Sequence, residues 1–263
     1  MKHLKLFENF EIVEPINYGE PLNNKEINIL HGYNIMCPEF ILKDDNYYYV
    51  HDHRCENIKD LPLTYIHGLC SKFNITNYTI NDDHSIDVLG SVSISNRKLS
   101  KIPLKFNKVS KHFNCGHNNL TKLEGSPESV GWSFWCSFNK LTTLEGGPKS
   151  VGGDFICSFN ELTTLKGSPK YVGGYFICCD NKLTTLKGGP KWVGEDFICY
   201  DNQLTTLEGS PEHIGGDFDC SDNQLDSLKG APESIGKNLF CSNNPLISKR
   251  YKGIIKGKLI YNQ

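Results

Sequence analysis

The sequence predicts a β-solenoid, a fold in which successive coils of the chain stack on one another, and two observations lead to this prediction. The first is a frame, V/I-G-x-x-F-x-C-x-x-N-x-L-x-x-L-x-G-x-P, which is clearest over residues 151–169 and recurs every 21 residues. Repetition at a fixed period of this length is the sequence signature of a solenoid. The second is a column of asparagines at the same spacing: Asn118, Asn139, Asn160, Asn181, Asn202, Asn223 and Asn244.

The residues of one coil divide into an inward and an outward set. Residues 154–158 alternate as a β-strand does, so Phe155 and Cys157 should point into the core while Ile156 points outwards. Asn160 is expected to turn the chain out of the strand and to satisfy backbone groups at the bend. Because 21 residues leave no room for a full helix, we expect a parallel sheet on one face of the solenoid and extended or short-turn segments on the other.

The repeats divide the chain into segments with different expected roles. The solenoid should occupy residues 88–246, with about eight coils, of which the first is degenerate and has Val92 in place of Phe. Residues 16–87 are expected to form a small α+β capping domain, with a helix over 61–73 and a hairpin over 77–88, because the first coil of a solenoid has an apolar face without a neighbour. Residues 1–15 are expected to be an N-terminal tail or targeting tag, and the basic segment 247–263 is expected to cap the other end.

Composition narrows the classes of partner. The chain has 28 Lys+Arg against 30 Asp+Glu, so there is no general electrostatic attraction to nucleic acid or to an anionic membrane. It has no apolar run long enough for a transmembrane helix and no secretory signal at its N-terminus. Seven of its eleven cysteines share one inward repeat position, which favours buried free thiols over disulfides or a metal ladder, and hence a reducing compartment.

The repeat region resembles a group of leucine-rich-repeat proteins found mainly in tailed bacteriophages and some large viruses. The motif F-x-C-x-x-N-x-L-T-T-L is similar to the L-x-V-x-x-N-x-L-x-x-L core of short bacterial leucine-rich repeats. In the viral group, a Y-T-I-N-x-D-x-S-I-D-V hairpin precedes P-L-K-F-x-K-V, and these motifs stand here at residues 78–88 and 103–109. The resemblance covers residues 78–246 and implies a leucine-rich-repeat solenoid of viral origin, but little chemistry.

Recognition by a solenoid is expected at the positions that differ between coils. The outward strand position holds Trp, Ile, Ile and Ile in four consecutive coils, with further aromatic residues near the strand ends. If exposed, such a strip suits a protein partner; the alternative is that β-branched neighbours support each other in the sheet without any ligand. The candidate protein-binding residues are Trp135, Phe138, Ile156, Phe159, Tyr175, Ile177, Ile198 and Tyr200.

Other polar clusters have simpler interpretations, and no cofactor is expected. His51, His53 and Cys55 have metal-ligand side chains on one face of a strand, but their spacing fits no standard zinc pattern, so we interpret them as ordinary strand residues. A column of aspartates lacks the convergent oxygen cage that calcium needs. Corner lysines are interpreted as a solvated face with cross-coil ion pairs rather than a phosphate-binding patch. The aspartate column consists of Asp180, Asp201 and Asp222, and the corner lysines are Lys149, Lys166, Lys170, Lys187 and Lys191.

No catalytic motif of the common hydrolase, P-loop or zinc-protease kinds is present. We therefore expect a non-enzymatic protein-interaction module, acting in the host cytoplasm if the viral resemblance holds, with its partner and oligomeric state left open. Residues 1–14 are similar to the N-terminal tags of internal virion proteins of large tailed phages, which begin M-K-x-x-x-x-F and end I/L-x-E, with Glu14 as the processing site. That similarity favours a packaged virion protein as the alternative. A host-recognition adhesin is a third interpretation, which the column of free thiols fits less well.

Overall fold

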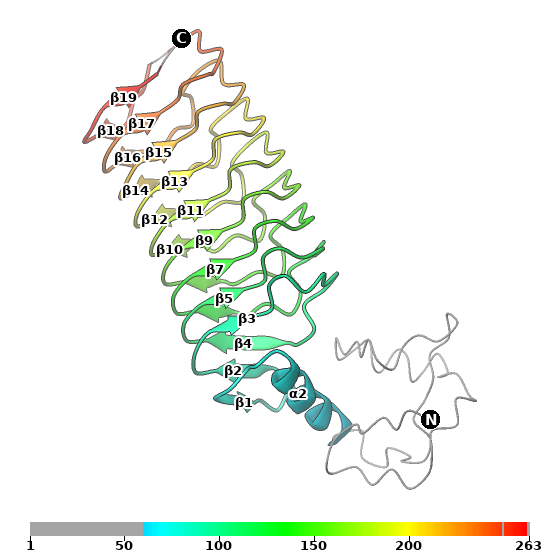
Figure 1. The fold of residues 1–263 in the computed structure, drawn as a ribbon. Coiled ribbons are helices and arrows are strands. Elements are labelled where there is room, and N and C mark those ends of the chain that lie inside the picture. The colour runs from blue at the N-terminus through cyan, green and yellow to red at the C-terminus, as the bar shows by residue number, and fades with distance from the viewer. Residues whose placement is uncertain (1–59, 249, 262–263) are drawn as a thin grey trace, which may run out of the picture.

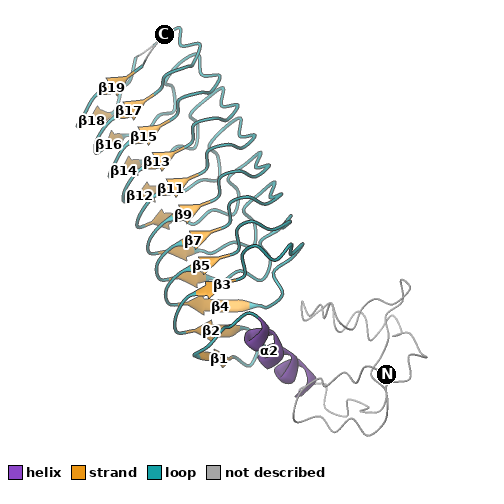
Figure 2. Cartoon of the chain, in the orientation of Figure 1, coloured by secondary structure: helices purple, strands orange, loops and turns teal. Residues whose placement is uncertain are grey.

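The predicted β-solenoid is confirmed by the structure, a computed structural model that describes residues 60–248 and 250–261. Figure 1 shows the coils stacked in chain order into an elongated rod, with helix α2 at one end and strand β19 at the other. Strands and loops make up every coil, and the described residues contain the single helix α2 (Figure 2).

The N-terminal end of the rod is closed by a helix and a hairpin. Helix α2 (Asp60–Lys72) contributes Ile66, Leu69 and Cys70 to the continuous hydrophobic core. Strands β1 (Tyr78–Ile80) and β2 (Ile86–Val88) form an antiparallel hairpin, and β2 then pairs in parallel with β4 (Phe106–Val109). The hairpin therefore starts a sheet that the repeats continue.

Each coil contributes two short strands, so the solenoid has two parallel sheets where the sequence predicted one. The Phe sheet has nine strands, one for each coil: β3 (Val92–Ser93), β5 (Phe113–Asn114), β7 (Phe134–Trp135), β9 (Phe155–Ile156), β11 (Phe176–Ile177), β13 (Phe197–Ile198), β15 (Phe218–Asp219), β17 (Leu239–Phe240) and β19 (Leu259–Ile260). The Val sheet has ten strands, which are β1, β2, β4, β6 (Ser129–Val130), β8 (Ser150–Val151), β10 (Tyr171–Val172), β12 (Trp192–Val193), β14 (His213–Ile214), β16 (Ser234–Ile235) and β18 (Ile254–Ile255).

In six successive coils, the corner between the two strands is a glycine that has no room for a side chain. A Cβ atom added at Gly173 would collide with the backbone oxygen of Gly152 in the preceding coil, and Gly194 stands in the same relation to Gly173. Glycine therefore allows the coils to approach closely enough for the Gly173 N–H to donate to the Val151 carbonyl, at 3.2 Å. This contact extends the backbone ladder of the Val sheet around the corner.

The core is built from stacked columns of identical side chains. Phe155 and Phe176 are fully buried, and their ring centroids lie 5.3 Å apart at an interplanar angle of 12°. The column cysteines are buried free thiols, and burial raises the pKa of Cys157 well above its usual value. A thiol in this environment stays protonated and acts as a small apolar side chain.

The asparagine column joins successive coils, as expected. The side-chain amide of Asn160 donates to the carbonyl of Cys157 in its own coil and to that of Cys136 in the preceding one, both at 3.1 Å. Its Oδ1 accepts a hydrogen bond from the Leu141 N–H at 3.1 Å. Each asparagine thus satisfies backbone groups that the end of the strand leaves unpaired.

The C-terminal segment differs from the expected cap. Strands β18 and β19 pair in parallel with β16 and β17, with Ile255 opposite Ile235 and Ile260 opposite Phe240. Residues 250–261 therefore prolong the solenoid by one more coil. Its core-facing residues are half-buried rather than buried, because the described residues place no further coil on them.

Candidate functional site

The predicted apolar strip forms a ladder on the outer face of the Phe sheet. Trp135 lies opposite Ile156, Ile156 opposite Ile177, and Ile177 opposite Ile198 on neighbouring parallel strands. Strands of a sheet lie about 4.8 Å apart, so these side chains contact their neighbours along the solenoid axis. All four are half-buried, because each covers part of the next. The outward faces remain available to a partner.

Phe138 and Phe159 stand at a second outward column, immediately before the asparagine that recurs from Asn118 to Asn244. We call this the left-handed column, because every one of its residues has a φ between 49° and 57°. Asn and Asp tolerate this region, whereas a bulky side chain such as Phe adopts it rarely and with strain. The column consists of Asn96, His117, Phe138, Phe159, Asp180, Asp201, Asp222 and Asn243.

Three members of the column stack as an aromatic ladder, consisting of His117, Phe138 and Phe159. The His117 and Phe138 ring centroids lie 4.3 Å apart at 11°, and those of Phe138 and Phe159 lie 4.4 Å apart at 8°. Phe138 and Phe159 are 44% and 45% exposed although each ring is covered by its neighbour. The exposed part is therefore largely the row of ring edges.

The same column becomes acidic in the coils that follow. Asp180, Asp201 and Asp222 succeed one another in three adjacent coils, and none of them forms an ion pair with the residues that the structure describes. Burial and the charges of Asp180 and Asp222 raise the pKa of Asp201 above its ordinary value. Within the described ranges, no group of three or more candidate ligands is arranged to hold a metal ion. The row is thus a run of carboxylates without a cationic partner.

The two candidate tyrosines lie on either side of the ladder of isoleucines. Tyr175 is exposed at the corner before β11, where its N–H donates to Asp154 at 3.1 Å. Tyr200 is half-buried, and its hydrogen bond with the Cys179 thiol raises the pKa of Tyr200 to about 12. The Tyr200 hydroxyl therefore stays neutral at physiological pH.

An aromatic cluster that the sequence did not reveal adjoins Trp135. The His112 ring stacks on Trp135 at 4.9 Å and 19°, and it meets Trp132 edge-on at 5.0 Å. Lys111 places its Nζ atom 5.4 Å from the centre of the Trp132 ring, which is within cation–π range. Trp132 is 52% exposed and occupies a corner position where the next two coils have Gly153 and Gly174. That difference between coils is the sequence signal that could have identified it.

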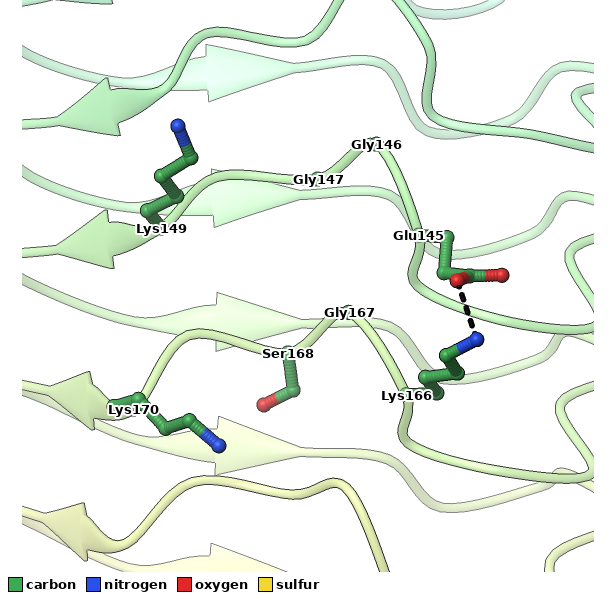
Figure 3. Close-up of a pocket in the computed structure, with 8 residues that line it drawn as sticks. All are labelled: Glu145, Gly146, Gly147, Lys149, Lys166, Gly167, Ser168 and Lys170. Atoms are coloured by element: carbon green, nitrogen blue, oxygen red, sulfur yellow. Dashed lines mark ion pairs between the residues drawn. The ribbon is translucent and has the colours of Figure 1, made fainter.

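The corner lysines are paired, which supports their interpretation as a solvated face. Figure 3 shows a shallow pocket between two coils, where the Lys166 Nζ atom lies 2.8 Å from a carboxylate oxygen of Glu145. Three further lysines reach a glutamate in the neighbouring coil, and of the five predicted residues Lys170 alone has no ion pair among the described residues. The three pairs are Lys149–Glu128, Lys187–Glu208 and Lys191–Glu212.

Two sequence predictions concern features beyond this surface. His51, His53 and Cys55 lie outside the described residues, as do the N-terminal tail and Glu14. Within the residues that are described, no helix combines the length and the apolar character needed to cross a bilayer.

Comparison with known proteins adds a distant structural likeness. No protein-family model matches the chain, and no curated protein sequence matches it. Among solved structures, the chain is similar to YopM from Yersinia enterocolitica WA-314, with a TM-score of 0.34 and 18% sequence identity. The similarity covers 65% of this chain and 55% of that chain. A likeness of this size supports no functional inference, so function has to be inferred from the residues above.

Proposed function

We propose that this protein is a non-enzymatic interaction module that binds a protein partner through the outer face of the Phe sheet. The observation that carries the proposal is the continuous apolar surface formed by Trp135, Ile156, Ile177 and Ile198 in register, beside the exposed rings of Phe138 and Phe159. Contiguous apolar patches on a soluble protein mark interaction sites, and aromatic anchors usually supply much of the binding energy.

The chemistry of the repeat favours binding over catalysis. The nucleophiles that the repeat supplies in quantity are its column cysteines, and burial raises the pKa of Cys157 and Cys199 far above the range of a reactive thiolate. The polar residue that recurs in seven successive coils is asparagine, and the amide of Asn160 is engaged with the backbone. The variable outward positions are therefore the ones free to take on a function.

The proposal can be tested with a variant in which charged residues of alternating sign replace the apolar residues of the strip. In Trp135→Lys/Ile156→Glu/Ile177→Lys, neighbouring coils carry opposite charges, so the sheet is not destabilised by like-charge contacts. Affinity capture from host or infected-cell lysate, quantified by mass spectrometry, should lose the specific partner with this variant. The circular dichroism spectrum should stay that of the parent chain.

The matched control places the same charges on the Val sheet of the same coils, as Ser129→Lys/Ser150→Glu/Tyr171→Lys. These residues face outwards in register and belong to no proposed site. The control should capture the partner as the parent does. Equal capture by the parent and the strip variant would exclude the Phe sheet as the binding surface.

A packaged virion protein is the second candidate, and the observation that favours it is the tag-like sequence of residues 1–14. In that case the protein would act inside the virion rather than in the host cytoplasm. Peptide mass spectrometry of purified particles tests this role, which requires an N-terminus that begins after Glu14. Particles that lack the protein, or that contain it with Met1 intact, would contradict a processed internal component.

A further inference from the structure

The aromatic ladder is not required by the fold. Five of the eight residues in the left-handed column are Asn or Asp, which form the same turn without aromatic rings. Asp180 has a φ of 53° and Phe159 a φ of 54°, so the backbone is the same in adjacent coils. Asn or Asp would form this turn with less strain than Phe. A strained residue that the scaffold does not need indicates selection for function.

The geometry of the ladder limits the kind of ligand that it fits. Nucleobases and sugars bind to the open faces of aromatic rings. Here both faces of Phe138 and one face each of His117 and Phe159 are covered by stacking, at centroid distances of 4.3 and 4.4 Å, so the exposed surface of the ladder is largely a row of edges. Ring edges suit apolar side chains and the faces of other aromatic rings, which prefer edge-to-face contacts. A polypeptide meets these requirements better than a nucleic acid or a glycan.

The acidic half of the column specifies the charge of that polypeptide. Asp180, Asp201 and Asp222 continue the row without ion pairs from the described residues, and Asp219 adds a half-buried carboxylate on the neighbouring strand position. Burial raises the pKa of Asp201, and the neighbouring charges of Asp180 and Asp222 raise it further, because adjacent carboxylates in the column repel one another. Lysine or arginine side chains from a partner would relieve this repulsion.

We propose that the left-handed column binds an extended segment of a partner protein in which apolar residues are followed by Lys or Arg. The apolar residues contact the His117–Phe138–Phe159 ladder, and the cationic residues contact Asp180, Asp201 and Asp222. Five coil spacings of about 4.8 Å make a surface of about 24 Å, which an extended chain covers with about seven residues. This inference rests on the proposed protein-binding function and names the chemistry of the partner.

The experiment selects peptides from a random eight-residue display library with the full chain, and it counter-selects with Phe138→Asn/Phe159→Asp. Both replacements occur naturally in the column, so this variant keeps the turn. We expect enriched peptides with apolar residues at one end and Lys or Arg at the other. No enrichment, acidic peptides, or basic and apolar residues in no fixed order would each overturn the proposal.

Affinities of the selected peptide, measured by fluorescence anisotropy, then separate the two halves of the site. Phe138→Asn/Phe159→Asp should weaken binding by at least about tenfold, as loss of aromatic anchors does, while the melting temperature stays equal or rises. Asp180→Asn/Asp201→Asn/Asp222→Asn should weaken binding and reduce its salt dependence. The control Glu195→Gln/Glu233→Gln removes exposed carboxylates elsewhere and should change nothing. Stronger binding of labelled oligo(dT) or of a glycan array than of the peptide overturns the proposal.

The outcomes also distinguish this inference from the broader function. If the strip variant at Trp135, Ile156 and Ile177 loses the lysate partner while Phe138→Asn/Phe159→Asp keeps it, the Phe sheet binds a protein and the left-handed column does not. If both lose the partner and the selected motif occurs in it, both proposals hold. If neither loses the partner, both fail.

Discussion

Replacement of Asn160 by alanine tests the idea that the asparagine column holds the coils together. The side chain is 8% exposed and makes hydrogen bonds to backbone groups in two coils, among them the Leu141 N–H and the carbonyls of Cys136 and Cys157. A third carbonyl, that of Ser158, lies 3.3 Å from the same amide nitrogen. Alanine removes all of these contacts without changing the strand or the core residues.

The size of the destabilisation follows from the backbone groups that lose their hydrogen-bond partner in Asn160→Ala. A buried N–H without an acceptor costs about 1–3 kcal/mol, and the two lost amide donors add about 0.5–1.5 kcal/mol each. The expected loss of unfolding free energy for Asn160→Ala is therefore roughly 2–6 kcal/mol, with the lower end reached if water enters the space. Asn160→Asp should be at least as harmful at neutral pH, because a buried carboxylate would face carbonyl oxygens.

Urea denaturation followed by circular dichroism measures the loss, and hydrogen exchange locates it. Solenoid coils interact chiefly with their nearest neighbours, so the Leu141 amide should exchange faster while amides near helix α2 keep their protection. Asn119→Ala is the control, since Asn119 is exposed next to the same column. Equal urea midpoints for Asn160→Ala and Asn119→Ala would show that the column contributes nothing beyond its turn.

Three further predictions concern the scaffold. Phe155→Ala should lower the unfolding free energy by about 3–5 kcal/mol, because it opens a cavity in the stacked ring column, and denaturant titration would reveal a smaller loss if neighbouring rings close the space. Gly173→Ala should lower the urea midpoint, because its Cβ collides with the Gly152 backbone oxygen, and an unchanged midpoint would mean that the coils can separate at the corner. Cys157 and its column should resist Ellman's reagent at pH 8 until urea unfolds the chain, and rapid labelling of the native protein would contradict their burial. Because burial raises the thiol pKa in the folded state, stability should be full below the ordinary thiol pKa of about 8.5 and should fall as pH rises above it, which thermal melts over a pH series would detect.

The sequence predicted the features that follow from strict repetition. A fixed period places Phe155 against Phe176 and Asn160 next to Asn139 in the adjacent coil, so the core columns and the asparagine column follow from the sequence alone. The outward ladder followed from the alternation of residues 154–158, and its register is as expected. The alternation did not predict how exposed these outward side chains are. Ile156 is half-buried, because the outward side chains of the adjacent strands cover part of it.

The features that were missed have identifiable physical causes. In the Val sheet, the strands from β6 onwards have two residues with one inward side chain each, and such strands are too short to show a period of two. The C-terminal coil has Leu259 and Tyr261 where the frame has Phe and Cys, and it is one residue shorter, with Ile255 opposite Ile235, so its sequence suggested a cap. The left-handed column did leave a signal, because Asp and Asn recur before the invariant asparagine and both tolerate positive φ.

A repeat scaffold makes each departure from its consensus interpretable in energetic terms. Isoleucine at 156 and 177 agrees with the preference of a sheet for β-branched residues, so the scaffold alone is enough to explain it. Phe138 and Phe159 disagree with the preference of their backbone, and a bulky residue in the left-handed region costs about 1–2 kcal/mol. Stacking contributes about 0.5–1.5 kcal/mol per ring pair, which is of the same size as the backbone strain. Stacking therefore does not by itself explain why Phe is present at these positions. The aromatic residues of the left-handed column are therefore stronger evidence for recognition than the longer ladder of isoleucines beside them.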